Sequence, residues 1–152
     1  MEKFETADAI LDFAIENEIE SYKFYTDLAT KAAHPEMKMV FLDFAAEEQK
    51  HKQLLEDAKK GKKISFGKGE KIADLKIADF TVDVQPTPNM EYKDALVLAM
   101  KKEKKAFQLY TMLANIADTQ NEIELFRSLA QQEAKHKLRF ELEYDQIVLK
   151  ED

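Results

Sequence analysis

The chain has 152 residues, a formal net charge of −7 and no cysteine. The length suits one domain with a substantial core, while the lack of cysteine excludes disulfides, thiolate metal sites and iron–sulfur clusters. Three glycines are too few for a turn-rich β fold, no glycine-rich phosphate-binding motif is present, and the acidic balance disfavours nucleic acid as a partner.

Four helices are predicted, in two pairs. The segments 4–60 and 89–149 are rich in Ala, Leu, Glu, Lys and Phe, a composition typical of amphipathic helices. Pro35 suits the first turn of a new helix within the first segment, and Asp118 or Thr119 is the expected N-cap within the second. The helices are expected over residues 4–32, 35–60, 89–117 and 120–149.

Residues 61–88 differ from both helical segments. They hold all three glycines and two of the three prolines, so we expect a connector with one short helical turn. The chain is therefore predicted to be a single domain over residues 1–152, made of a helical hairpin over 4–60, a crossover over 61–88 and a second hairpin over 89–149.

The two hairpins repeat each other at a spacing of 85 residues. An ungapped comparison of residues 8–56 with this second copy gives fifteen identities, which indicates an internal duplication. The acidic and imidazole residues kept in both copies are Glu18 and Glu103, Glu48 and Glu133, Glu56 and Glu141, and His51 and His136. Glu47 is replaced by Gln132 in the second copy. Because the acid is not retained, Glu47 is not a candidate ligand.

Glu18, Glu48, Glu103 and Glu133 share two further features. Each lies on an apolar helix face, whereas Glu56 is surrounded by lysines and is expected to pair with them on the surface. Each also lies fifteen residues from the turn of its hairpin, which places all four carboxylates about 22 Å from a turn, near the middle of the helices. We therefore expect the four carboxylates to meet inside the bundle.

Buried carboxylates need a compensating positive charge. Two divalent metal ions would neutralise the four carboxylates. His51 and His136 each follow a retained glutamate by three residues, so that carboxylate and imidazole share one helix face. These donors suit iron, manganese or zinc, and their spacing does not separate the three metals.

This residue set resembles the ligand set of the ferritin-like di-iron carboxylate superfamily. The spacing from Glu18 to Tyr25 and from Glu103 to Tyr110 resembles the rubrerythrin branch in particular. The resemblance implies an all-α fold, a ferritin-like antiparallel four-helix bundle with one long crossover between the second and third helices. The metal ligands that it implies are Glu18, Glu48, His51, Glu103, Glu133 and His136, with Glu48 and Glu133 bridging two iron ions.

The resemblance also implies a function. The expected activity is reduction of hydrogen peroxide or dioxygen at a non-haem di-iron centre of four glutamates and two histidines, with manganese or zinc as other candidate metals. Full rubrerythrins carry a rubredoxin domain with four cysteine ligands, which this sequence lacks, so the electrons would come from a separate donor protein such as a rubredoxin. Tyr25 and Tyr110 are catalytic candidates near the metal, either as partners of ligands or of a bound oxygen species, or they are plain core aromatics.

Two other functions stay open at this point. One is iron sequestration or storage in a ferritin-type assembly, although no fifth helix of the ferritin cages follows the fourth. The other is a structural helical dimer with an inert site. We expect a homodimer in the cytoplasm without nucleic-acid or membrane partners, and the long crossover would allow its hairpins to be exchanged.

Overall fold

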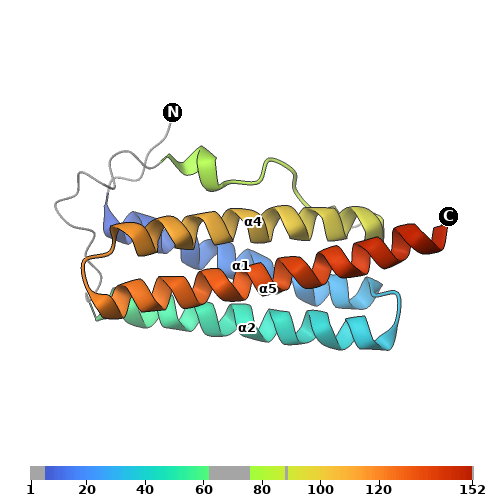
Figure 1. Cartoon of the computed structure of the whole chain (residues 1–152), viewed down its shortest axis with the longest axis horizontal. Coiled ribbons are helices and arrows are strands. Elements are labelled where there is room, and N and C mark those ends of the chain that lie inside the picture. The colour runs from blue at the N-terminus through green and yellow to red at the C-terminus, as the bar shows by residue number, and fades with distance from the viewer. Residues whose placement is uncertain (1–5, 62–75, 88, 152) are drawn as a thin grey trace.

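The computed structural model describes residues 6–61, 76–87 and 89–151 (Figure 1). These residues form four α-helices and one short 3-10 helix, which confirms the predicted all-α fold. The elements are α1 (Ala7–Lys31), α2 (Pro35–Lys60), η1 (Ile77–Phe80), α4 (Tyr92–Ile116) and α5 (Gln120–Glu151). None of these helices is both long enough and apolar enough to cross a membrane.

Local capping sets where the helices begin. Thr6 is extended, and its side chain accepts a hydrogen bond of 3.0 Å from the Ala9 amide, so α1 begins at Ala7 and not at residue 4 as predicted. Pro35 occupies the first turn of α2, as predicted. Thr119, one of the two predicted caps, accepts a hydrogen bond of 3.3 Å from the Glu122 amide at the start of α5.

The third α-helix begins at Tyr92, three residues after the predicted start. The backbone of Glu91 is still extended, with φ −66° and ψ 150°, and it serves as the N-cap. In the described part of the crossover, η1 is a short helical turn, as the sequence predicted. Residues 62–75 and 88 of the predicted crossover lie outside the described residues.

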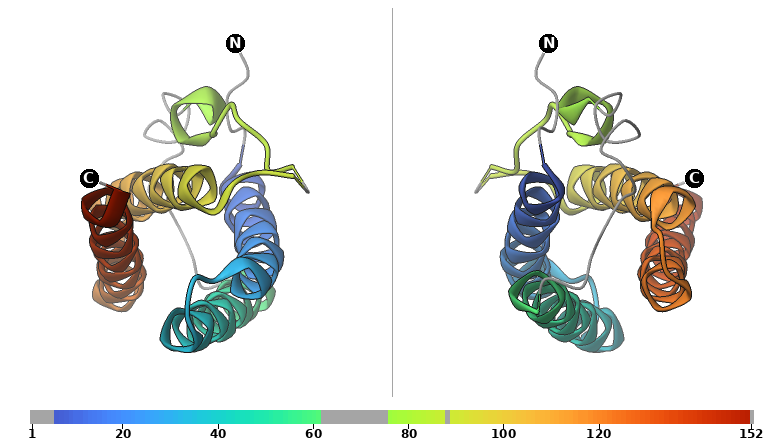
Figure 2. Two further views of the ribbon diagram at one scale, coloured as in Figure 1. Left: turned by 90° about the vertical axis from the view of Figure 1, so that its right-hand side faces the viewer. Right: turned by 90° about the vertical axis from the view of Figure 1, so that its left-hand side faces the viewer.

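The helices pack as two antiparallel hairpins, α1 with α2 and α4 with α5 (Figures 1 and 2). Helices α2 and α4 run in the same direction, as the predicted long crossover requires. The described part of the crossover lies over the outside of α1 and α4 (Figure 2), where η1 contacts α4. One such contact is a hydrogen bond of 3.0 Å from the Lys105 ammonium to the Asp79 carbonyl.

Two apolar clusters fill the bundle, one toward each end. Tyr110 and Phe126 belong to one cluster, and Tyr25 and Phe41 belong to the other. Tyr110 and Phe126 are the repeats of Tyr25 and Phe41, so equivalent residues of the two hairpins lie in opposite clusters. The bundle therefore has a pseudo-two-fold axis across its middle, and the buried polar residues of the next section surround that point.

Candidate metal centre

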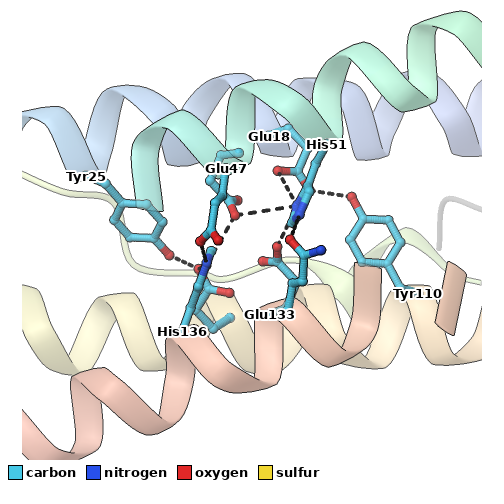
Figure 3. A network of polar contacts seen from close by, with 10 residues as sticks. Glu18, Tyr25, Glu47, His51, Tyr110, Glu133 and His136 are labelled. Atoms are coloured by element: carbon cyan, nitrogen blue, oxygen red, sulfur yellow. Dashed lines mark hydrogen bonds and ion pairs between the residues drawn. The ribbon is translucent and has the colours of Figure 1, made fainter. Parts of the chain in front are cut away.

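Six buried polar side chains gather at the middle of the bundle, between the two apolar clusters. Figure 3 shows four of them, Glu18, His51, Glu133 and His136, facing one another. The six come from all four α-helices, and each is at most 2% exposed. They are the six residues that the sequence singled out: Glu18, Glu48, His51, Glu103, Glu133 and His136. The structure thus brings the whole predicted set together.

The six side chains form two overlapping groups, each of which can hold a metal ion. Within each group, one donor atom per residue lies within 4.8 Å of the others. One ion with ligand bonds of about 2.1 Å holds opposite ligands ~4 Å apart, so a shared cation needs at most a small inward movement of the most distant donors. The groups are Glu18, Glu48, His51 and Glu133, and Glu48, Glu103, Glu133 and His136. Glu48 and Glu133 belong to both, as expected of bridging ligands.

The two imidazoles point their Nδ1 atoms into the cluster. His51 Nδ1 lies 2.9 Å from Glu133 and 3.5 Å from Glu18. His136 Nδ1 lies 3.3 Å from Glu48 and 3.6 Å from Glu103. The rings are nearly parallel, with centroids 6.5 Å apart. Each histidine therefore faces carboxylates of both hairpins.

The outer nitrogen of each histidine contacts a residue that the sequence did not single out. His136 Nε2 lies 2.5 Å from a carboxylate oxygen of Glu47, and His51 Nε2 lies 2.7 Å from the amide oxygen of Gln132. Because both partners are acceptors, Nε2 carries a proton in each ring and Nδ1 is the atom free for a metal. Glu47 and Gln132 occupy equivalent positions in the repeat, and this equivalence is the sequence signal that could have identified them.

Tyr25 and Tyr110 also connect the hairpins. The Tyr25 hydroxyl donates a hydrogen bond to Glu103, and the Tyr110 hydroxyl donates one to Glu18 (Figure 3). Both rings are at most 1% exposed. Burial, followed by the charge of nearby carboxylates, raises the pKa of each phenol well above its ordinary value. Each tyrosine therefore keeps its proton and fixes one glutamate. A contact with a bound oxygen species stays a prediction.

The four glutamates of the cluster carry more negative charge than the two histidines can neutralise. Burial, followed by the charge of Glu18 and Glu103, raises the pKa of Glu48 well above its ordinary value, and Glu133 is raised in the same way. Burial lowers the pKa of His51, but contacts with Glu133 and Glu18 outweigh this and raise it to about 10. In the metal-free protein, protons on the cluster therefore stand in for cations.

The cluster passes a direct test of fit to metal. Six inward-facing atoms are buried yet make no hydrogen bond within the described part of the chain: Glu18 Oε2, Glu48 Oε1, His51 Nδ1, Glu103 Oε2, Glu133 Oε1 and His136 Nδ1. Buried polar atoms normally have partners, and leaving one unsatisfied costs about 1–3 kcal/mol. Cations among these atoms would satisfy all six at once, so the residues present fit a pair of carboxylate- and imidazole-bound metals.

A cavity of about 220 Å³ reaches this cluster from the outside. It lies between α1 and α4 under the crossover, and Glu18 and Glu48 are part of its wall. Ser21, Lys102 and Ala106 line it on the way, with Phe80 and Val82 contributed by the crossover. A molecule the size of peroxide therefore has a path to two carboxylates of the cluster.

Comparison with known proteins agrees with this site. The family model for rubrerythrin matches residues 9–144. A hypothetical protein from Pyrococcus furiosus shares the fold with a TM-score of 0.72 and 25% identity, over 91% of this chain and 88% of that one. A putative ferritin-like diiron-carboxylate protein from Thermotoga maritima shares it with a TM-score of 0.71 and 20% identity, over 92% of this chain and 95% of that one. No curated protein matches the chain significantly. Since the family match spans both hairpins and all six cluster residues, the chain belongs to the rubrerythrin family.

Proposed function

We propose that this protein is a di-iron redox protein that reduces hydrogen peroxide or dioxygen with electrons from a separate donor protein. The observation that carries the proposal is the pair of overlapping carboxylate and imidazole groups buried at the pseudo-two-fold axis. Membership of the rubrerythrin family and the diiron-carboxylate description of the Thermotoga maritima neighbour support iron as the metal.

Each of the six side chains has a definite role in this proposal. Glu48 and Glu133 belong to both groups and would bridge two ions. Glu18 with His51 would complete one site, and Glu103 with His136 the other. Iron held there would supply electrons to an oxidant, one from each ion. Peroxide takes up two electrons and two protons to give two molecules of water, so two ions that give one electron each are sufficient.

The surrounding residues prepare the site for this chemistry. The Tyr25 and Tyr110 hydroxyls hold Glu103 and Glu18 in place and keep their own protons. The two histidines are oriented from outside by Glu47 and Gln132. The cavity between α1 and α4 gives a small oxidant access, while the apolar clusters on either side exclude bulk water.

The described site has no electron relay of its own among the residues of this sequence. These 152 residues include no cysteine, so they do not contain the four-cysteine iron site of full rubrerythrins. We propose a separate small electron-transfer protein, such as a rubredoxin, as the donor, and a small oligomer such as a homodimer as the working form.

A peroxide titration tests the proposed function. Protein purified without oxygen and loaded with Fe(II) should contain about two irons per chain in a small oligomer. Hydrogen peroxide should oxidise it rapidly, as measured by near-ultraviolet absorbance, with one peroxide consumed per two irons. Glu48→Ala removes a carboxylate common to both groups and should lose this fast oxidation. Equal rates in the two proteins would refute the proposal, and many irons per chain in a large shell would support storage instead.

A further inference from the structure

Glu47 and Gln132 occupy equivalent positions in the repeat but differ in charge. Each reaches across from one hairpin to the outer nitrogen of a histidine in the other hairpin, and Figure 3 shows Glu47 beside His136. The contact to His136 comes from a carboxylate at 2.5 Å, and the contact to His51 comes from a neutral amide oxygen at 2.7 Å. The two halves of an otherwise repeated site therefore differ at one defined atom.

This difference has a known chemical consequence for a metal-binding imidazole. A carboxylate that accepts the outer N–H makes the other ring nitrogen a stronger electron donor, and it does so more than a neutral amide does. Glu47 would also bring negative charge near a cation bound at His136. Its side chain is 41% exposed, so solvent screens part of this charge. Outer partners of this kind change metal affinity by about 10–100-fold, and this exposure points to the lower part of that range.

The packing around the His136 ring also differs from the packing around the His51 ring. The Phe44 ring stacks on it with centroids 3.9 Å apart and planes 20° apart. The residue equivalent to Phe44 in the second hairpin is Leu129, which has no ring to stack on His51. His136 is thus held in orientation by both its hydrogen bond and its packing.

We propose that the two metal sites of this protein are unequal, and that the site of His136, Glu103, Glu48 and Glu133 fills first. Glu47 is the positioning residue that raises its affinity, and Gln132 leaves the site of His51 as the weaker one. The inference rests on the proposed two-metal site. It adds that the ions load in a fixed order, which would let a half-loaded protein exist.

A zinc titration tests the order of loading. Zn²⁺ accepts carboxylate and imidazole ligands and is not redox-active, so binding is measured apart from any reaction with peroxide. Calorimetry on metal-free protein should show two steps whose dissociation constants differ by about tenfold. The chain has three histidines, so ring nitrogen NMR of histidine-labelled protein can follow each. His136 should shift at the first equivalent and His51 at the second, while His34 at the bundle end serves as a reference.

Matched substitutions separate the roles of the two acceptors. Glu47→Gln should weaken binding at the His136 site about tenfold and remove the preference, so that the two histidines shift together. Gln132→Glu should remove the preference by strengthening the His51 site. The double exchange should restore a preference, with the histidines shifting in the opposite order. Glu56→Gln is the control, because Glu56 also lies on α2, is 39% exposed and pairs with Lys52. This variant should leave the order and the spacing of the steps unchanged.

The outcomes also separate this inference from the proposed function. Two histidines that shift together in the unmodified protein, or a His136-first order that persists in Glu47→Gln, would overturn the proposed order while leaving a two-metal peroxide-reducing site intact. Failure to bind any divalent metal would instead overturn the proposed function. Because Glu47 and Gln132 lie at the edge of the cluster and are partly exposed, their substitutions should leave the fold intact, which circular dichroism checks.

Discussion

Removing metal should make the stability of this protein fall as the pH rises from about 6.5 to about 8. The reason lies in His51, whose pKa is lowered by burial but raised overall to about 10 by Glu133 and Glu18. A group with a higher pKa in the folded state stabilises the fold fully below its unfolded pKa, and this contribution is lost as the pH rises toward the folded value. The raised pKa values of Glu48 and Glu133 act in the same direction.

The size of the loss follows from proton linkage. Over this pH range the folded protein keeps the proton on His51 while the unfolded chain, with a histidine pKa of about 6.5, releases most of it. Integrating the difference gives a loss of about 2 kcal/mol in the free energy of unfolding from this one group. For a domain of this length the melting temperature should fall by roughly 4–8 °C.

Thermal unfolding followed by circular dichroism, with and without bound metal, measures this effect. Bound metal replaces the protons of the cluster, and metal affinity rises with pH as those protons become easier to displace. The loaded protein should therefore hold or gain stability over the same range. His51→Asn removes the proton site and should flatten the pH dependence of the metal-free protein. A metal-free protein that gained stability with rising pH would refute the reasoning.

Three further predictions concern the packing and access of the site. Tyr25→Phe and Tyr110→Phe each remove one buried hydrogen bond and should each cost about 1–2 kcal/mol in urea unfolding of the metal-free protein, and clearly unequal costs would contradict their two-fold equivalence. Phe41→Ala and Phe126→Ala, both at fully buried positions, should each cost about 3–5 kcal/mol by the same measurement, and a cost under ~1 kcal/mol would show that the core refills. Ala106→Phe narrows the cavity and should slow oxidation by peroxide with Fe(II) content unchanged, whereas an unchanged rate would place the path elsewhere.

The six cluster residues were predictable from the sequence for a physical reason. A charged side chain on an apolar helix face is costly, so its presence twice at the same place in a repeat indicates a shared partner. Glu47 and Gln132 were missed because the comparison kept only identical residues. What the two positions share is an acceptor oxygen, which Glu and Gln both have.

The ends of the helices were less predictable than the cluster. Helix α1 begins where Thr6 caps it, and α4 begins only after the extended Glu91, although helix-forming residues precede both starts. Composition therefore extends a predicted helix past the point where backbone geometry stops it. The cavity could not be predicted from the sequence either. Val82 of the crossover lines it only because of the path that the crossover takes over α1 and α4.

The two-fold arrangement explains why one chain, and not two identical hairpins, suits this site. Four hydrogen bonds at the cluster cross between the hairpins: Tyr25 to Glu103, Tyr110 to Glu18, His51 to Gln132 and His136 to Glu47. Two copies of a single hairpin would make the same crossed links but would carry the same acceptor on both histidines. Joining the hairpins in one chain removes that constraint, because each half can then change alone. The Glu47 and Gln132 pair is such a change, and it gives a symmetric fold a site with two different ends.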